Sequence, residues 1–375
     1  MDVVLIMKGN SMKQIYRFCI TGGPCAGKST GMSKIRSKLH DLGYLVITVP
    51  EMATELISSG ITPNGSTSFY EFQECIMEGQ LAREQAYLTF AEKVMNQKVV
   101  ILFDRGLKDN KAYCKESEWI DLLEQFNLSD TAINCRYDAI IHLRTAAFGE
   151  DDSYTTINNS ARKETKEEAR ALCEKTLNAW NGHPHLHVIE NQNSFEHKMA
   201  HVVGVILHHL GEPEPLEIEK KFVVDSSFCL EKIPVNYVVS SIEQHYLSDK
   251  SRVRSRTEGG VSVYTRTWKH STGRKGVRIE REENITGREY RMLKNEAISS
   301  LHKKRVCFVY DHQYFELDFF EKEYACAQKN GALILLEIEL TSIDTKVRIP
   351  PWLPVIEEVT GDNEYDNIQL SLPLN

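Results

Sequence analysis

The sequence predicts an α/β domain, built on a parallel sheet with helices on both faces, followed by a mainly antiparallel β-barrel domain. Strand-like and helical segments alternate through the first half, and a glycine-rich loop joins the first strand to the first helix. The second half consists mainly of short strands in which apolar and charged residues alternate. We expect the domains to span residues 1–210 and 217–375, with a linker at 211–216 that holds two prolines and a glycine.

Composition narrows the classes of function. The chain has 375 residues, of which 41% are hydrophobic, so it is long enough for two cores. Its net charge of −8 argues against general nucleic-acid binding. The nine cysteines are scattered and never spaced Cys-x-x-Cys, which indicates reduced thiols. With no signal-peptide pattern and no long apolar run, we expect a cytoplasmic protein without a transmembrane segment.

The first half contains the segments of a parallel sheet. Strands are expected at residues 16–21, 45–50, 98–103, 137–143 and 186–190. Helices are expected at 29–42, 69–97 and 194–210. This alternation is typical of a sheet covered on both faces by helices.

The loop after the first expected strand has the complete spacing of a Walker A phosphate-binding loop. Its glycines allow successive backbone N–H groups to point into one anion-binding concavity. The following helix directs its positive end at the phosphates, where a lysine contacts the outer phosphates and a serine hydroxyl binds Mg²⁺. The nucleotide-binding residues are Gly22, Gly23, Pro24, Cys25, Ala26, Gly27, Lys28, Ser29 and Thr30.

Candidate catalytic residues follow two other expected strands. Asp104 ends the apolar run 99–103, which is the Walker B position, where a carboxylate holds Mg²⁺ or acts as a base. Arg105 follows Asp104 in the sequence Asp-Arg-Gly, and this turn resembles the nucleoside and nucleotide kinase branch of P-loop proteins. Glu51 follows the strand at 45–50, where that branch often places a substrate-binding acid; a helix N-terminal acid is an equal alternative.

A charged segment lies between the fourth and fifth expected strands. Its arginines Arg162 and Arg170 stand where kinase-like domains carry a mobile lid that closes on the transferring phosphate. A solvated charged helix explains the same pattern. The histidines of the stretch 181–187 are interrupted by a proline and lead into a strand, so no metal site is expected there.

The strands of the second half carry charges on one face. Because strand side chains alternate with period two, the acids and bases of each strand share a side and the opposite side is apolar. A single strand with this pattern is explained by a solvated outer face. Seven such strands together favour a barrel whose charges point inward. Such a barrel would bind a polyphosphate together with a metal ion. The bases are Lys221, Arg252, Arg254, Arg256, Lys269, Arg278, Lys303 and Arg305. The acids are Glu217, Glu219, Glu280, Glu282, Asp318, Glu337 and Glu339.

This pattern resembles the CYTH, or triphosphate tunnel metalloenzyme, superfamily. Its signature Glu-x-Glu-x-Lys is met by Glu217, Glu219 and Lys221, and the similarity extends to the closing stretch 359–367. The resemblance implies anion binding by Lys221, Arg254, Arg256, Lys269, Arg278 and Arg305. It also implies that the seven acids named above bind Mg²⁺ or Mn²⁺.

The order of the two domains resembles the TRPL-translocation-defect family. Further similarity lies in the stretches 20–24, 137–143, 175–184 and 188–191. The resemblance implies guanine-nucleotide binding, anionic-lipid binding, a role in membrane-protein trafficking and peripheral contact with membranes.

We therefore expect a regulatory protein that binds Mg²⁺ with GTP or ATP in its first domain and a phosphate-bearing small molecule or phospholipid headgroup in its barrel. The alternative is a bifunctional enzyme, with a small-molecule kinase in the first domain and a metal-dependent triphosphatase in the barrel. The absence of an Asn-Lys-x-Asp guanine-reading motif leaves GTP and ATP both open.

Overall fold

Five parallel strands form the sheet of the first half of the chain. The structure is a computed structural model that describes residues 15–63, 67–95, 97–148, 165–191, 194–212, 216–321, 333–340 and 345–372. The strand order is β2-β3-β1-β4-β5, and each neighbouring pair is parallel. The strands are β1 (Ile15–Gly22), β2 (Leu45–Val49), β3 (Val99–Asp104), β4 (Ala139–Leu143) and β5 (Leu186–Ile189).

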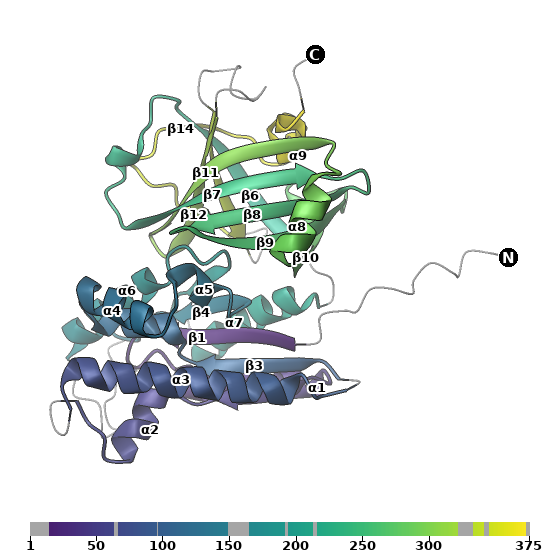
Figure 1. Cartoon of the computed structure of the whole chain (residues 1–375). Helices are drawn as coiled ribbons and strands as arrows, with labels where there is room; N and C mark the ends of the chain where they lie inside the picture. The colour runs from purple at the N-terminus through teal and green to yellow at the C-terminus, as the bar shows by residue number, and fades with distance from the viewer. Residues whose placement is uncertain are drawn as a thin grey trace.

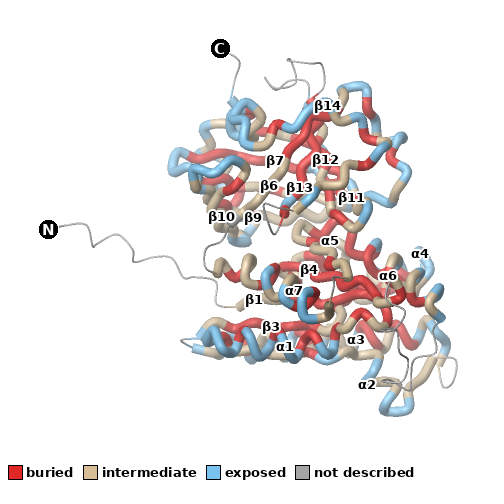
Figure 2. The backbone as a smooth tube through the Cα atoms, turned by 180° about the vertical axis from the view of Figure 1, so that it is seen from behind, coloured by how far each residue is buried: buried red, intermediate tan, exposed pale blue. Residues whose placement is uncertain are grey.

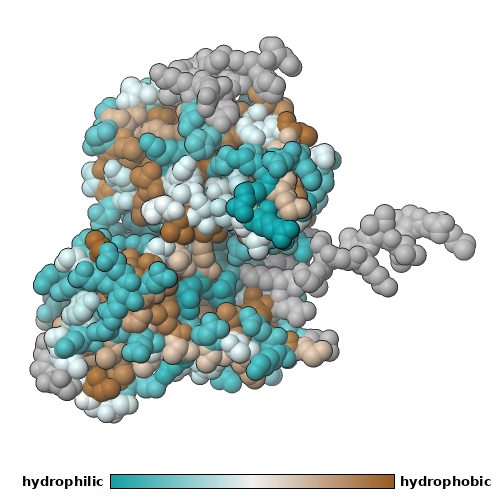
Figure 3. All heavy atoms as spheres, viewed as in Figure 1, coloured by the Kyte–Doolittle hydropathy of each residue, from teal (hydrophilic) through white to brown (hydrophobic). Residues whose placement is uncertain are grey.

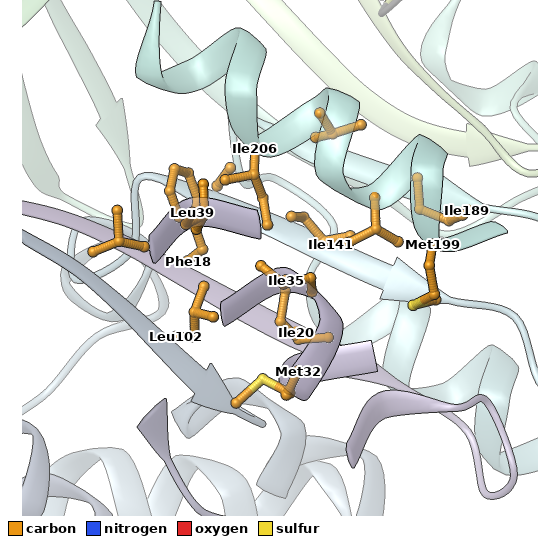
Figure 4. Packing of buried hydrophobic residues seen from close by; sticks show 14 of the residues in the cluster. Phe18, Ile20, Met32, Ile35, Leu39, Leu102, Ile141, Ile189, Met199 and Ile206 are labelled. Atoms are coloured by element: carbon orange, nitrogen blue, oxygen red, sulfur yellow. The ribbon is translucent and has the colours of Figure 1, made fainter. Parts of the chain in front are cut away.

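Helices cover both faces of this sheet. On one face, α1 (Lys28–Asp41) and α7 (Phe195–Leu210) pack against it through a cluster that includes Phe18, Ile35 and Ile206 (Figure 4). The other face buries Met77, Trp119 and Trp180. The elements on that side are α3 (Phe69–Ala91), η1 (Leu107–Tyr113), α4 (Glu116–Gln125), α5 (Asp130–Asn134) and α6 (Lys166–Ala179); the short α2 (Met52–Ser58) packs beside α3.

Local sequence fixes where the long helices begin. Ser68 and Glu71 form a capping box at the start of α3, and Thr165 and Glu168 form another at α6. The side chain of Ser194 caps α7. The sequence placed α3 and α7 correctly, but α3 ends at Ala91, six residues before the expected end.

Eight antiparallel strands of the second half close into a barrel. The order β10-β9-β8-β7-β11-β12-β13-β6 is completed by pairing of β10 with β6, in which Arg278 lies opposite Glu217, and β14 adds to β6. This closure confirms the predicted fold class. The strands are β6 (Leu216–Val224), β7 (Tyr237–Tyr246), β8 (Ser251–Glu258), β9 (Val261–Ser271), β10 (Val277–Asn284), β11 (Ser299–Tyr310), β12 (Gln313–Phe320), β13 (Ile334–Leu340) and β14 (Val355–Glu358).

Alternation along the strands separates an apolar outer face from a charged inner face. Outer residues such as Phe222, Phe308 and Leu336 pack beneath Phe228 and Trp352 from the connecting segments. A second apolar cluster, which contains Tyr246, Leu301, Phe320 and Leu370, lies on the inner-facing side of several strands at the end of the barrel near α9 (Asn367–Leu370). Figure 2 shows the central strands β1, β3 and β4 of the sheet and strands β12 and β13 of the barrel as mainly buried.

A short helix precedes the longest strand of the barrel. Helix α8 (Gly287–Lys294) is followed by strand β11 from Ser299 onward. Residues 299–310 form a strand because Leu301, Val306 and Phe308 occupy buried positions in the barrel. Two single turns, η3 (Leu230–Lys232) and η5 (Asn363–Tyr365), complete the elements of this half.

The barrel sits on the first domain along one side of the parallel sheet (Figure 1). Strand β12 lies beside β5, and β9 lies beside α5. The surface of this view mixes hydrophilic and hydrophobic residues over both halves (Figure 3). In the part of the chain that the structure describes, every helix is too short or too polar to cross a bilayer.

Candidate functional site

The phosphate loop lies between β1 and α1, as its spacing predicts. Gly22 has a φ of +134° and Gly27 a φ of +86°, which side chains rarely allow. A Cβ atom on Gly22 would lie 2.1 Å from the carbonyl oxygen of Leu143, and one on Gly27 would lie 2.5 Å from the ring of Phe195. The close packing against β4 and α7 therefore requires glycine at both positions.

The side chain of Lys28 is buried in this loop. Its Nζ donates hydrogen bonds to the carbonyl oxygens of Gly22 at 3.2 Å and Gly23 at 3.1 Å. Burial, together with the nearby charge of Arg105, lowers the pKa of Lys28 to about 8. An anionic phosphate is the kind of partner that would restore the charged form.

Asp104 ends β3 beside Lys28 with one oxygen unpartnered. Its Oδ1 is buried and accepts no hydrogen bond from any described residue. Burial and the nearby carboxylate of Glu51 raise the pKa of the Asp104 carboxyl, and they outweigh the positive charge of Lys28, which would lower it. A divalent cation would supply the missing partner, so Asp104 and the exposed hydroxyl of Ser29 fit a Mg²⁺ site.

Arg105, just after β3, contacts Glu51, just after β2. It has a left-handed backbone with a φ of +71°, and its Nε donates to Glu51. Its Nη1 lies 3.6 Å from Asp109, whose carboxylate also accepts from the hydroxyl of Thr21. Burial would raise the pKa of Glu51, but Arg105 and Lys28 outweigh it and lower this pKa to about 2. The structure thus brings the predicted residues Glu51, Asp104 and Arg105 together around Lys28.

The two predicted lid arginines are placed differently. Arg162 lies outside the described residues. Arg170 lies on α6, where its Nε donates to the carbonyl oxygen of Ala147 at 2.7 Å and its guanidinium lies 5.8 Å from the ring centre of Phe148. Arg144 stacks on the same ring at 3.8 Å. Arg170 thus supports the segment after β4, and no contact described here joins it to Lys28 or Asp104.

Sequence reasoning missed the residues that hold the phosphate loop from outside. Thr145 donates its hydroxyl hydrogen to the carbonyl oxygen of Pro24. Lys198 on α7 is buried and donates to the carbonyl oxygens of Ala26 at 3.1 Å and Arg144 at 2.6 Å, and to Asn191 Oδ1 at 3.0 Å. A signal was present for Lys198, because it occupies an apolar position of the helix, three residues after Phe195.

The predicted basic residues line the inner face of the barrel, and most of them have acidic partners. Arg305 donates to Asp318 at 2.6 and 2.7 Å and to Glu337 at 2.6 Å, and Lys221 lies 2.9 Å from Glu337. Further pairs are Lys303 with Asp318 and Glu337, Lys269 with Glu217 and Glu280, Arg254 with Glu282, Arg252 with Glu280 and Glu282, Arg256 with Glu258, Arg305 with Glu316, and Arg278 with Asp366. Arg256 contacts Gly182 of the first domain.

Two of the predicted metal-binding acids, Glu280 and Glu282, pair with Arg252, Arg254 and Lys269. The other five fall into three environments. Asp318 and Glu337 are buried, with two or three bases around each, so a metal would have to replace existing partners. Glu339 faces two histidines of the first domain. Glu217 and Glu219 line a small pocket together with Lys221, Arg278 and Asp366. Burial, together with the neighbouring carboxylates, raises the pKa of Glu217 and of Glu219 to about 7.

The charge balance of the pocket near Glu217 and Glu219 fits a cation. Glu219 has a basic neighbour only at 3.8 Å, the Nζ of Lys221, among the described contacts. A divalent ion would favour the charged form of both carboxylates, and carboxylate oxygens are suitable ligands for Mg²⁺ or Mn²⁺. No group of three or more acidic, histidine or cysteine residues with ready metal geometry occurs among the residues that the structure describes.

Comparison with known proteins identifies the first domain. A family model described as an AAA domain matches residues 17–198, which include the phosphate loop and Asp104. No curated protein matches the chain. The first domain is therefore a P-loop-like nucleotide-binding domain.

Three solved structures are similar to parts of the chain. The hypothetical protein NE1496 is 31% identical over 42% of this chain and 99% of its own, with a TM-score of 0.30. The structure titled inorganic triphosphatase NE1496 is 29% identical over 42% and 95%, with a TM-score of 0.29. NadR in complex with NAD and AMP-PNP is 13% identical over 53% and 50%, with a TM-score of 0.38.

Proposed function

We propose that the chain is a regulatory protein that binds GTP or ATP with Mg²⁺ in its first domain and an anionic phosphate group in its barrel. The observation that carries the proposal is the environment of Lys28. Its buried ammonium has two neutral carbonyl acceptors, and burial lowers its pKa more than the nearby carboxylates raise it. A nucleotide phosphate would supply the charge that this site lacks.

Two features of the barrel support a phosphate ligand. The Nε of Arg252 is buried and donates no hydrogen bond to any described residue. Its nearest acidic contacts, to Glu280 and Glu282, are long, at 3.8 and 3.9 Å. A buried guanidinium donor without an acceptor is costly, and a phosphate oxygen in the barrel would satisfy it.

The resemblance to the TRPL-translocation-defect family supports a more specific ligand. It favours GTP in the first domain, a phospholipid headgroup in the barrel, peripheral membrane contact and a role in membrane-protein trafficking. We propose these ligands and roles for the chain, together with the cytoplasmic location expected from the sequence.

An enzymatic function is the second candidate. The adjacent carboxylates of Glu217 and Glu219, each with a pKa of about 7, favour a metal-dependent triphosphatase in the barrel. The cluster of Asp104, Glu51 and Arg105 favours a small-molecule kinase in the first domain, with Asp104 as base.

Calorimetric titration of GTP and ATP with Mg²⁺ into the full chain tests nucleotide binding. Lys28→Ala should lose about 2–4 kcal/mol of binding free energy, the cost of removing a desolvated charged donor. Lys34→Ala is the matched control, because Lys34 lies on the same helix but is exposed and paired with Glu196. Equal affinities of Lys28→Ala and the parent would contradict the assignment.

Phosphorus NMR separates the two candidate functions. GTP, ATP and tripolyphosphate are incubated with the chain and Mg²⁺ or Mn²⁺. A binding protein leaves them intact over many hours, whereas steady release of phosphate that Glu219→Gln abolishes would favour the enzyme.

A further inference from the structure

The first domain covers one mouth of the barrel. Asn181 donates from Nδ2 to the carbonyl oxygen of Asn236 at 3.2 Å, just before β7. The next residue, Gly182, has a φ of +89°, and a Cβ atom on it would lie 2.9 Å from Val238 on β7. The turn at residues 181–185 therefore packs directly against the barrel wall.

This contact orients one of the inner arginines. Arg256 on β8 donates from Nη2 to the carbonyl oxygen of Gly182 at 2.6 Å and from Nε to the hydroxyl of Ser240 at 3.2 Å. Two acceptors fix the plane of a guanidinium, because its donors form a rigid fork. The direction in which Arg256 presents its remaining donors is thus set partly by the first domain.

The same mouth contains a carboxylate that the first domain neutralises. Glu339 lies on β13, on the same side of the strand as Glu337. Its two oxygens lie 3.7 Å from Nδ1 of His185 and 3.6 Å from Nε2 of His208. Both histidines belong to the first domain, His185 just before β5 and His208 on α7.

The electrostatics support an ionic pair between His185 and Glu339. Burial alone would lower the pKa of His185, but Glu339 outweighs it and raises this pKa to about 9. Burial would raise the pKa of Glu339, but the two histidines hold it well below its usual range. The other titratable groups around His185 are Glu280 and Glu282 on β10, His209 on α7, His183 in the same turn and His187 on β5.

We propose that the first domain completes the anion site of the barrel: Gly182 orients Arg256, and His185 pairs with Glu339 beside His208. A phosphate-bearing ligand near this mouth then meets an oriented arginine and a Glu339 carboxylate that two histidines face. Gly182, His185 and His208 are positioning residues in this arrangement, since they act through Arg256 and Glu339. The inference rests on the proposed binding of a phosphate group in the barrel.

The physical reason is repulsion between like charges. Without a cationic partner, the carboxylate of Glu339 would oppose an incoming phosphate, and like charges placed close together weaken binding. Replacing His185 by a neutral residue should therefore weaken binding, and neutralising Glu339 as well should restore it.

Calorimetric titration of tripolyphosphate into the full chain tests this. His185→Gln should bind at least about fivefold more weakly than the parent, the lower end of typical coupling between sites. Glu339→Gln should bind at least as tightly as the parent, and the double variant should match Glu339→Gln within about twofold. His187→Gln is the matched control, because His187 lies on β5 with its Nε2 against His209 at 2.7 Å, and should bind as the parent does.

The outcomes separate this inference from the proposed function. Equal affinities of His185→Gln and the parent, or a double variant as weak as His185→Gln alone, would overturn the inference while leaving phosphate binding in place. A folded parent that binds no tripolyphosphate would overturn the proposed function of the barrel, and the inference with it.

Discussion

Lys198 on helix α7 donates a hydrogen bond of 3.1 Å to the carbonyl oxygen of Ala26 in the phosphate loop. The two residues are 172 positions apart, and the ammonium also bonds to the carbonyl oxygen of Arg144 and to Asn191. One buried charge thus ties the loop to the ends of two further segments of the sheet. The loop geometry depends on α7 as well as on its own glycines.

Lys198→Met should destabilise the first domain and weaken nucleotide binding. The substitution leaves three buried acceptors without their donor, which costs about 1–3 kcal/mol. Urea unfolding and nucleotide titration measure the two effects. The exposed variant Lys34→Met should change the unfolding free energy by less than about 1 kcal/mol. An unchanged unfolding midpoint for Lys198→Met would show that the ammonium does not support the loop.

Asp104→Asn should reduce Mg²⁺-dependent nucleotide binding more than metal-free binding. The change removes a charge and hardly any volume, so the loss should reflect the cation rather than packing. Titrations of nucleotide with Mg²⁺ and with a chelator provide the comparison. The same Mg²⁺ dependence in variant and parent would mean that the unpartnered Oδ1 does not serve the metal.

Metal binding in the barrel should depend on pH through Glu217 and Glu219. Their folded pKa of about 7 lies above the ordinary value of 4.5, so the folded chain binds more protons than the unfolded chain between these values. The contribution of this pair to stability therefore falls as pH rises through that window.

A divalent cation needs both carboxylates deprotonated. Mn²⁺ should consequently bind more tightly, and release fewer protons, as pH rises from about 6 to about 8. Calorimetry in buffers of different ionisation enthalpy measures the proton release, which the variant Glu217→Gln with Glu219→Gln should lack. An affinity for Mn²⁺ that does not change over this range would contradict the assignment.

Arg305→Ala should destabilise the barrel strongly. The side chain is buried and bridges Asp318 and Glu337, and its loss leaves these carboxylates short of a partner, at a cost of about 3–5 kcal/mol. Urea unfolding followed by tryptophan fluorescence measures the loss of unfolding free energy. Arg266→Ala is the control, since Arg266 pairs with the half-exposed Asp249 and should cost less than about 1 kcal/mol. Similar losses for both variants would argue against a tight inner network.

Much of the first domain could be predicted from short-range patterns. The phosphate loop is nine consecutive residues, and its glycines and Lys28 fix their roles through local backbone conformation. The apolar run before Asp104 gave β3 to within one residue. Lys198 could not be assigned in the same way, because its partner Ala26 is distant in the sequence and their contact depends on how α7 packs on the sheet.

In the barrel, the sequence by itself determined which side chains share a face, because strand periodicity is a property of consecutive residues. The charged faces were expected to point inward from the number of such strands, and the pairing of β10 with β6 closes the barrel around them. Only the tertiary structure decided the partner of each charge. Glu337 and Glu339 share a face, yet one pairs with bases of the barrel and the other with His185 and His208. Such pairings depend on strand register and on the docking of the first domain, which no local pattern encodes.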